Sequence, residues 1–376
     1  MLSRVLDILV CAFIFLNILA FEFPIMGVPL RFIVIALLLV LSFIIGPKYF
    51  LSGHFVKFII PAYYFYFILT VYSLSQGNDM ENIMLYIRPL LMLLTIPPFM
   101  YLFDKYGVKR YMNVFCISCI GLVFVFIYYY YKVIVDPSII ADLQEEEGLV
   151  QAVINDLGPR VVIKTFVMLV PFAIYVMEKI QGLKFHIFFV LIIILGALSQ
   201  MFGLIIPVVI FYFYILYKRG ERKTIYLTLL GIALFAVSQV MFVKDIMDTK
   251  ESSADAKSSQ IANIFKDMDS LDLLFGRGIG CIFKNFDGRS DATPLLEVSA
   301  VQIFQAGGFL FIWLILYVYL RPALKAIKSN NDYQLKLIGL SYLGFFLASL
   351  TNPYLLGGGA LLLIVMIVAY PRNRAY

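Results

Sequence analysis

The chain has 376 residues, of which 62% are apolar and 14% are charged, and its mean hydropathy is +0.92. Charged residues make up roughly a quarter of soluble domains, so this composition excludes an ordinary water-soluble fold and indicates a membrane protein. The net charge of +6 comes without a basic patch interleaved with exposed aromatic residues, and we therefore expect no nucleic acid among the partners.

Apolar stretches of about 20 residues, the length that crosses a bilayer, recur along the chain with short polar connections between them. We predict an all-α polytopic membrane protein of about 12 spanning helices in a single membrane domain, residues 1–376. The predicted spans are residues 5–22, 28–46, 55–75, 87–103, 112–132, 160–178, 184–199, 202–217, 225–242, 297–320, 335–351 and 354–370. Residues 184–217 are predicted to be a tight hairpin of two helices, with a re-entrant segment as the alternative.

Lysine and arginine residues gather in alternate connections, which orients the helices because short basic loops stay in the cytoplasm. Eighteen of them, from Arg4 to Arg374, fall on one side. With an even number of helices, both termini are then cytoplasmic. The opposite side holds, besides the longest loop, Arg31, Arg88, Lys132, Arg160 and Lys164.

The first larger outer loop is expected at residues 133–158. It carries an acidic run, Glu145 to Glu147, followed by apolar residues spaced as on one face of a helix: Leu149, Val150, Val153, Ile154 and Leu157. We predict a short amphipathic helix on the membrane surface that delivers Arg160 to the mouth of the sixth spanning helix. The alternative is that Arg160 only contacts lipid phosphates, as many arginines at helix ends do.

The longest outer loop is expected at residues 243–296. It contains seven cationic and nine acidic residues, so its overall charge does not favour the binding of polyanions. Its middle has the helical spacing i, i+3, i+4 and i+7, which predicts a second short amphipathic helix, preceded by Lys257. The apolar positions of that helix are Ile261, Ile264, Phe265 and Met268. Residues 271–275 are apolar apart from Asp272 and are expected to insert into the bundle.

The run Gly276-Arg277-Gly278-Ile279-Gly280 comes next. Three glycines in five residues permit a tight turn with positive φ angles or a close approach of the backbone to a ligand, with Arg277 exposed between them. Arg277 and Arg289 suit a phosphate group, because a planar guanidinium makes bidentate hydrogen bonds and keeps its charge. The run lacks the lysine of a Walker A loop. A purely structural glycine turn, and an ion pair of Glu297 with either arginine, are the alternatives.

Metal and cofactor chemistry is not expected. Cys116 and Cys119 form a C-x-x-C, but it lies inside an apolar span without a second pair or a nearby histidine. Both histidines, His54 and His186, fall at predicted cytoplasmic helix ends. Serine–histidine–aspartate and histidine–metal chemistry on the outer face is therefore excluded.

The order of these features resembles the Wzy-type O-antigen polymerases of bacterial surface polysaccharides. The resemblance covers the topology over most of the chain, and its residues lie between Lys257 and Gly308. It is carried by Lys257-x-x-Gln260-Ile261, Leu274-Phe275-Gly276-x-Gly278-x-Gly280, Arg289, Glu297-x-Ser299 and Gly307-Gly308, after the acidic first loop and Arg160. Relatives often have an arginine in the turn before the eighth helix, whereas residues 199–203 have none.

The resemblance implies a multi-pass glycosyltransferase of the bacterial inner (cytoplasmic) membrane that uses no nucleotide sugar. On the periplasmic face, such an enzyme transfers the growing glycan from undecaprenyl diphosphate onto a lipid-linked repeat unit. The implied partners are the undecaprenyl-diphosphate-linked oligosaccharide, membrane lipids and a chain-length regulator protein.

For that reaction the expected catalytic residues are Glu297, as the base for the acceptor hydroxyl, and Arg289. The residues expected to bind the diphosphate are Arg160, Arg277, Lys257, Gly276, Gly278 and Gly280. Three other functions stay open. The first is an O-antigen ligase, a class that shares the topology but has a histidine near the position of Glu297. The second is a lipid-linked oligosaccharide flippase, a class with two similar halves and short outer loops. The third is a small-solute transporter, a class that carries ionisable residues near helix centres.

Overall fold

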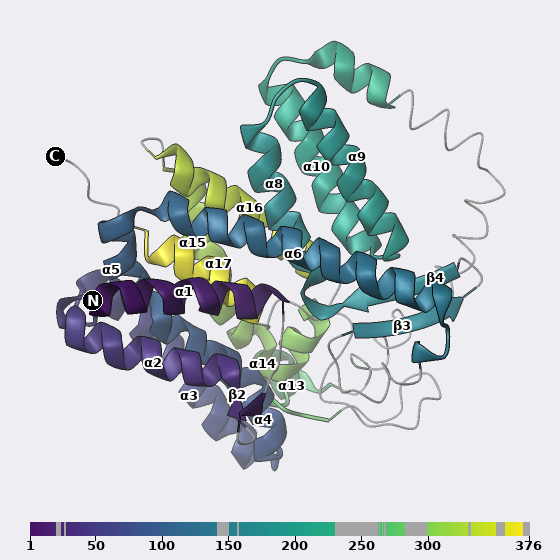
Figure 1. Cartoon of the computed structure of the whole chain (residues 1–376). Coiled ribbons are helices and arrows are strands. Elements are labelled where there is room, and N and C mark those ends of the chain that lie inside the picture. Colours follow the sequence, from purple (N-terminus) through teal and green to yellow (C-terminus); the bar gives the residue numbers. More distant parts are fainter. Residues whose placement is uncertain are drawn as a thin grey trace.

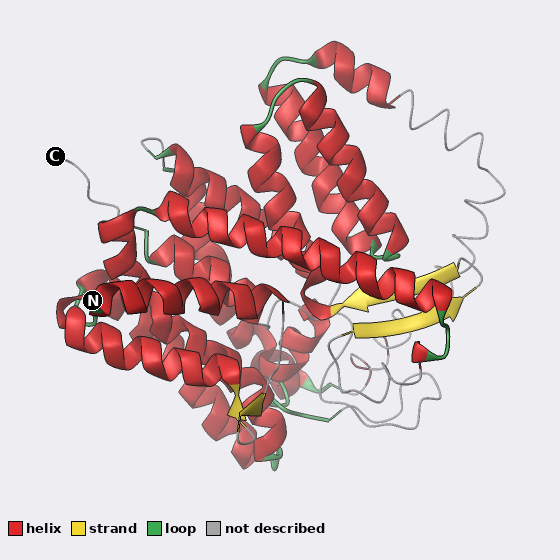
Figure 2. Cartoon of the chain, viewed as in Figure 1, coloured by secondary structure: helices red, strands yellow, loops and turns green. Residues whose placement is uncertain are grey.

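The computed structural model describes residues 1–19, 24–25, 28–140, 150–155, 158–229, 262, 264, 266, 268–282, 299–329, 332–350 and 358–370. Helices dominate these residues, and two short antiparallel strand pairs are the exceptions (Figures 1 and 2). The predicted helical architecture is therefore confirmed except at the two hairpins.

The first helices of the chain run back and forth along one another (Figure 1). The long helix α6 and α2 both pack against α1, and the hairpin β1–β2 joins α1 to α2. Their bounds are α1 Leu2–Leu19, β1 Pro24–Ile25, β2 Val28–Pro29, α2 Leu30–Ile45, the short 3-10 helix η1 Pro47–Tyr49, α3 Gly53–Ser75 and α6 Val108–Val135.

The fourth predicted span, 87–103, is longer and less regular than expected. It runs over residues 80–106 as α4 Met80–Ile87, the 3-10 helix η2 Arg88–Thr95 and α5 Ile96–Tyr106. Pro89, Pro97 and Pro98 cause this division, because proline has no amide hydrogen and interrupts the α-helical ladder.

The chain after β4 adds a group of packed helices, α8, α9, α10 and α16, and the central helix α17. The predicted two-helix hairpin at 184–217 is confirmed by α9 and α10. The bounds are α8 Leu169–Lys179, α9 Leu183–Leu198, α10 Phe202–Lys218, α13 Ser270–Phe275, α14 Ser299–Ile315, the π-helix η4 Leu316–Leu320, α15 Arg321–Ile327, α16 Tyr333–Ser349 and α17 Gly358–Val368.

The predicted tenth span, 297–320, is not a straight helix. Gly308 interrupts α14 with a φ of 55°, and the direction changes by 64° between Val301–Trp313 and Leu316–Ile327. Glycine permits this backbone conformation, which other residues rarely adopt.

The predicted amphipathic helix after Leu149 is wrong. Residues 150–163 form an antiparallel hairpin of β3 Val150–Asn155 and β4 Gly158–Ile163, followed by the 3-10 helix η3 Lys164–Met168. The sixth predicted span, 160–178, is therefore α-helical only from Leu169. Half of the residues in each strand are β-branched, which favours extended backbone. The same apolar spacing also fits a strand that packs on one face.

The described helices are those of a membrane protein. Four segments are long and apolar enough to cross a bilayer: Leu2–Leu19, Gly53–Ser75, Met80–Tyr106 and Val108–Val135. A fifth is added if the bent pair Val301–Trp313 and Leu316–Ile327 counts as one span. Shorter apolar helices are Leu30–Ile45, Leu183–Leu198, Gly203–Lys218 and Gly358–Val368. The count of 12 spans stays a prediction. Large apolar side chains such as Phe43 and Phe67 are exposed on α2 and α3, as a lipid-facing surface requires.

Three contacts join parts of the chain that are predicted to lie on the same side of the membrane. Lys105 donates to Ser3, and Tyr49 donates to Asp104. His54, at the start of α3, lies 3.0 Å from the carbonyl oxygen of Val368, at the end of α17. We call this the basic end. The outer end is the other one, with the α3–α4 turn, residues 276–280 and the first residues of α2 and α17.

Candidate functional site

Five of the eight predicted site residues are described. Lys257, Arg289 and Glu297 lie outside the described residues, and their roles stay predictions. The other five divide between two places: Gly276, Arg277, Gly278 and Gly280 form one turn, and Arg160 lies on β4.

The turn 276–280 has the backbone that its glycines predict. The φ angles of Gly276, Gly278 and Gly280 are 71°, 86° and 78°. All three glycines are buried, and what their backbone approaches closely is the protein itself. This packing favours the structural role that was the alternative to direct ligand binding.

The turn packs closely against Gly307-Gly308, the other glycine motif that resembles the polymerases. A Cβ atom on Gly276 would lie 2.4 Å from the amide nitrogen of Gly307. A Cβ atom on Gly308 would lie 2.5 Å from the carbonyl carbon of Leu274. Backbone contacts this close tolerate no side chain, so the two glycine motifs hold α13 against α14.

The other face of the turn packs on the α3–α4 connection. Cβ atoms on Gly278 and Gly280 would lie 2.5 Å from the Asn78 side-chain nitrogen and 2.6 Å from the Ile83 amide nitrogen. The turn is thus held between α14 on one side and α3–α4 on the other.

Hydrogen bonds from α3, Asn78 and α14 fix the turn, and they satisfy buried backbone groups that would otherwise be costly. From α3, Tyr72 Oη donates to the Gly276 carbonyl (2.9 Å), and Ser73 Oγ accepts from the Ile279 amide (2.7 Å). Asn78 Nδ2 donates to the carbonyls of Arg277 (2.9 Å) and Ile279 (3.3 Å). On the side of α14, the Arg277 amide donates to the Gln305 carbonyl (2.7 Å). The backbone of Arg277 is therefore rigidly placed.

The side chain of Arg277 is half-buried, although the sequence predicted it to be well exposed. Its Nε lies 2.9 Å from Asp272 Oδ2, and 35% of its side chain is exposed. Asp272 belongs to the short helix α13, whose first turn is capped by Asp269. The prediction that residues 271–275 insert into the bundle is wrong for their side chains, since Leu271, Leu274 and Phe275 are exposed.

Cys281, directly after the turn, is buried. Burial raises the pKa of its thiol to about 11, against a smaller lowering by Arg277. Its neighbours include Ile264 and Met268, so part of the long loop packs beside the turn. At neutral pH this thiol is protonated and is a poor nucleophile.

Arg160 lies on an exposed face of the β3–β4 hairpin and not at the mouth of a helix. It is opposite Val153 in the register, and both side chains are exposed. Ala152 and Val161 form the next pair and are buried. The alternation of a strand thus turns Arg160 away from the packed side.

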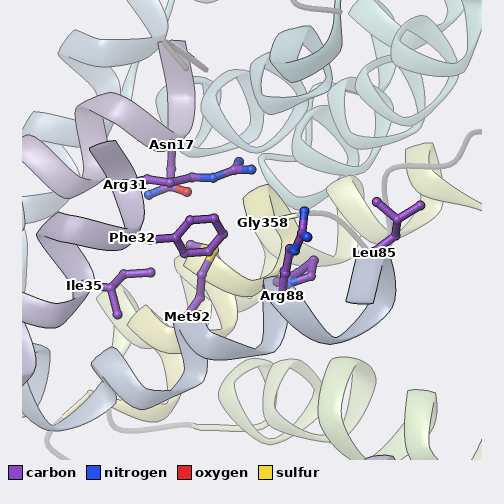
Figure 3. A pocket seen from close by; sticks show the side chains of 9 residues that line it. Asn17, Arg31, Phe32, Ile35, Leu85, Arg88, Met92 and Gly358 are labelled. Carbon is purple, nitrogen blue, oxygen red and sulfur yellow. The ribbon is translucent and has the colours of Figure 1, made fainter. Parts of the chain in front are cut away.

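A pocket at the outer end contains two arginines that the sequence did not single out. Arg31 near the start of α2 and Arg88 at the start of η2 line it together, and its volume is about 130 Å³ (Figure 3). The remaining lining residues are Asn17, Phe32, Ile35, Leu85, Pro89, Met92 and Gly358. Both arginines had been assigned to the outer side, but nothing in their separate sequence contexts predicts that they share a pocket.

Helix α4 separates the pocket from the glycine turn. Its buried residues Ile83 and Tyr86 face Gly280 and Gln302, whose side-chain amide donates to Tyr86 Oη at 2.7 Å. Leu85 and Arg88 belong to the pocket. The arrangement therefore places Arg277 and the two pocket arginines around one short helix.

Among the described residues, no three histidine, cysteine, aspartate or glutamate side chains are placed to hold a metal ion. Neither a family model nor a curated protein matches this chain.

Proposed function

We propose that this protein polymerises the repeat units of a bacterial surface polysaccharide, as Wzy-type O-antigen polymerases do. It would act in the inner membrane with 12 spans and both termini in the cytoplasm. Its substrate would be the undecaprenyl-diphosphate-linked oligosaccharide, and the reaction would occur on the periplasmic face. The expected protein partner is a chain-length regulator.

The observation that carries the proposal is the placement of Arg277. The motif that resembles the polymerases surrounds this arginine with glycines, and these glycines lock its backbone between α14 and the α3–α4 turn. A fixed cation stabilises a developing negative charge with little reorganisation, which is what a leaving diphosphate requires. The glycines then act by positioning Arg277 and not by contact with the substrate.

The proposed reaction joins two lipid-linked glycans. The acceptor hydroxyl oxygen forms a bond to the anomeric carbon of the growing chain, and the bond from that carbon to the diphosphate breaks. The diphosphate leaves with the electron pair, and Glu297 takes the hydroxyl proton. Arg277 and Arg289 neutralise the diphosphate, with Arg160 and Lys257 as further cations.

The position of Arg289 and Glu297 in the chain supports their proposed role together with Arg277. Their segment begins directly after Ile282 and ends at Ser299, the first residue of α14. Ile282 lies two residues after Gly280, and α14 packs against α13, the helix that precedes the turn.

Inactivation of the gene tests the function through the surface glycan on a gel. Loss of a polymerase leaves one repeat unit attached where a ladder of lengths existed before. Polymer stranded on its lipid would instead identify a ligase, and the absence of any exported repeat would identify a flippase.

A further inference from the structure

Helix α6 carries an apolar stripe that runs to its outer end. The large exposed side chains of this helix recur at intervals of three or four residues, as on one face of a helix. They are Ile117, Ile120, Phe124, Ile127, Tyr128, Tyr131, Ile134 and Val135. Other residues of the same helix, such as Cys119, Leu122 and Phe126, are buried in the bundle. On a segment long and apolar enough to cross a bilayer, the exposed stripe is the side that faces lipid.

The outer turns of α6 extend beyond the hydrocarbon core of a bilayer. The 28 residues of the helix extend about 42 Å, whereas the hydrocarbon core is roughly 30 Å thick. The first turn lies at the basic end with Lys109 and Arg110, so the last turns reach the headgroup layer of the other leaflet. They hold the residues typical of that layer, the tyrosine run 128–131 and Lys132, whose Nζ lies 5.7 Å from the ring centre of Tyr128.

The β3–β4 hairpin lies beside these outer turns, because β4 packs on α6 (Figure 1). Two contacts fix its level: Met168 O lies 3.8 Å from Cys119 Sγ, and the rings of Phe166 and Phe126 are 4.6 Å apart. The chain before Phe166 continues toward the outer end, and Arg160 lies up to about 16 Å farther out at the rise of a 3-10 helix and a strand. The end of α6 is about 14 Å beyond Phe126. Arg160 is therefore level with the end of α6, at headgroup depth.

The hairpin turns apolar and cationic side chains away from the bundle at this depth. Val153 is 48% exposed, and it lies opposite Arg160, which is also exposed. Ile154, at the next position of β3, is 51% exposed. The neighbouring pair Ala152 and Val161 is buried and holds the hairpin on the bundle. Aliphatic side chains next to an arginine suit the headgroup layer, where the former reach acyl chains and the latter reaches phosphates.

We infer that the β3–β4 hairpin is an interfacial anchor that binds the phospholipids of the leaflet at the outer end, with Val153 and Ile154 against the acyl chains and Arg160 on the phosphates. Anionic phospholipids are favoured over zwitterionic ones, because Arg160 and Lys132 are both cationic. The inference does not depend on the proposed polymerase activity. It is compatible with the role proposed there for Arg160, since the phosphates of a lipid diphosphate lie at the same depth.

The depth of the hairpin is measured with a fluorescent bimane label on the full-length protein in phosphatidylcholine nanodiscs. Val153→Cys carries the label in a chain whose native cysteines are replaced by alanine. A nitroxide at carbon 5 of the lipid acyl chain should quench this label at least about threefold more than a nitroxide at carbon 12, because quenching requires proximity and the hairpin is shallow. Ile120→Cys, near the middle of the stripe on α6 and 46% exposed, is the control and should show the opposite preference.

Three results of this measurement would overturn the inference. Quenching by aqueous iodide and by neither lipid would place the hairpin in water. Protection from iodide and from both lipids would mean that another part of the protein covers this face. Stronger quenching by the deeper nitroxide would place the hairpin in the hydrocarbon core. Ile154→Cys repeats the measurement at a second exposed position, and gel filtration selects the labelled proteins that elute as the parent does.

The role of Arg160 is tested with the same label and two lipids that carry the nitroxide at carbon 5. Phosphatidylglycerol should quench the Val153→Cys label about threefold more than phosphatidylcholine at equal mole fraction, and Arg160→Gln should bring this ratio close to one. Arg160→Lys should keep the ratio, because it keeps the charge. Lys223→Gln removes an exposed charge at the basic end and should leave the ratio unchanged. A ratio of one in the parent protein, or a ratio that Arg160→Gln does not lower, would overturn the assignment of Arg160 to lipid phosphates.

Discussion

The two ends of the bundle treat their cations differently. At the basic end, Arg110 lies 2.6 Å from Asp7, Lys218 lies 2.9 Å from Glu178, and Arg219 donates to the carbonyl oxygens of Met177 and Ile180. At the outer end, Arg88 and Arg160 are exposed and form no ion pair within the described part of the chain. These three cations of the basic end therefore connect helices, whereas Arg88 and Arg160 are exposed.

Arg277 is intermediate between these two groups. Its ion pair with Asp272 is local, five residues apart, and leaves the guanidinium partly exposed. An arginine held by one carboxylate can still bind a second anion through its other donors. The comparison therefore predicts that charge removal at the outer end affects function, and that charge removal from the pairs of the basic end affects stability.

The largest effect that the proposed function predicts is on polymer formation. Arg289→Ala and Glu297→Gln should each reduce the glycan ladder about 100-fold or more, because a base and a charge-stabilising group commonly contribute that much. Ladder intensity on a gel at matched protein levels measures it. The control is Lys325→Ala, an exposed position on α15, which should leave the ladder unchanged. Full ladders from both variants would contradict the proposed roles of Arg289 and Glu297.

Thiol alkylation would measure how tightly Cys281 is packed after the turn that carries Arg277. Because its pKa is raised from 9.0 to about 11, Cys281 should carry a roughly 100-fold smaller thiolate fraction at pH 8 than an unperturbed thiol. In a chain with Cys281 as its single cysteine, the maleimide reaction should be slow at pH 8 and should accelerate up to about pH 11.

The control for this measurement is the neighbouring position. Ile282 is 47% exposed, and a single cysteine at Ile282→Cys should react readily at pH 8. Equal rates at the two positions would mean that the turn is not packed as described.

Replacement of Gly276 by alanine should destabilise the protein by about 3 kcal/mol, from positive-φ strain and overpacking together. Gly77→Ala is the matched control, since Gly77 has a similar φ of 77° but open space around its Cβ position. It should cost only about 1 kcal/mol, the strain alone. Thermal unfolding in detergent measures both, and equal losses would show that the contact with Gly307 contributes nothing.

Asp7→Asn should destabilise the protein by about 2 kcal/mol, less than Gly276→Ala. Asp7 is buried and accepts hydrogen bonds from Arg110 and from Tyr111 Oη at 2.7 Å, and its charge strengthens both. Arg88→Gln should change the melting temperature hardly at all, because no described ion pair is lost. A larger loss from Arg88→Gln than from Asp7→Asn would reverse the assignment of the two ends.

The helices at 184–217 were predictable because their apolar runs are uninterrupted and end at a short polar turn. The hairpin at 150–163 was not, since Leu149, Val150, Val153 and Ile154 satisfy a helical stripe as well as a strand. Periodicity records which residues are apolar and leaves the choice of backbone to packing partners distant in the sequence.

The sequence alone was enough to predict a helical membrane protein and to indicate that Gly276, Gly278 and Gly280 can adopt positive φ angles. These properties follow from apolar length and backbone sterics, both of which are local. Tertiary structure alone decided that the turn locks onto Gly307-Gly308, that Asp272 pairs with Arg277, and that Arg31 and Arg88 share a pocket. Each of these depends on contacts between helices, which no local pattern of residues specifies.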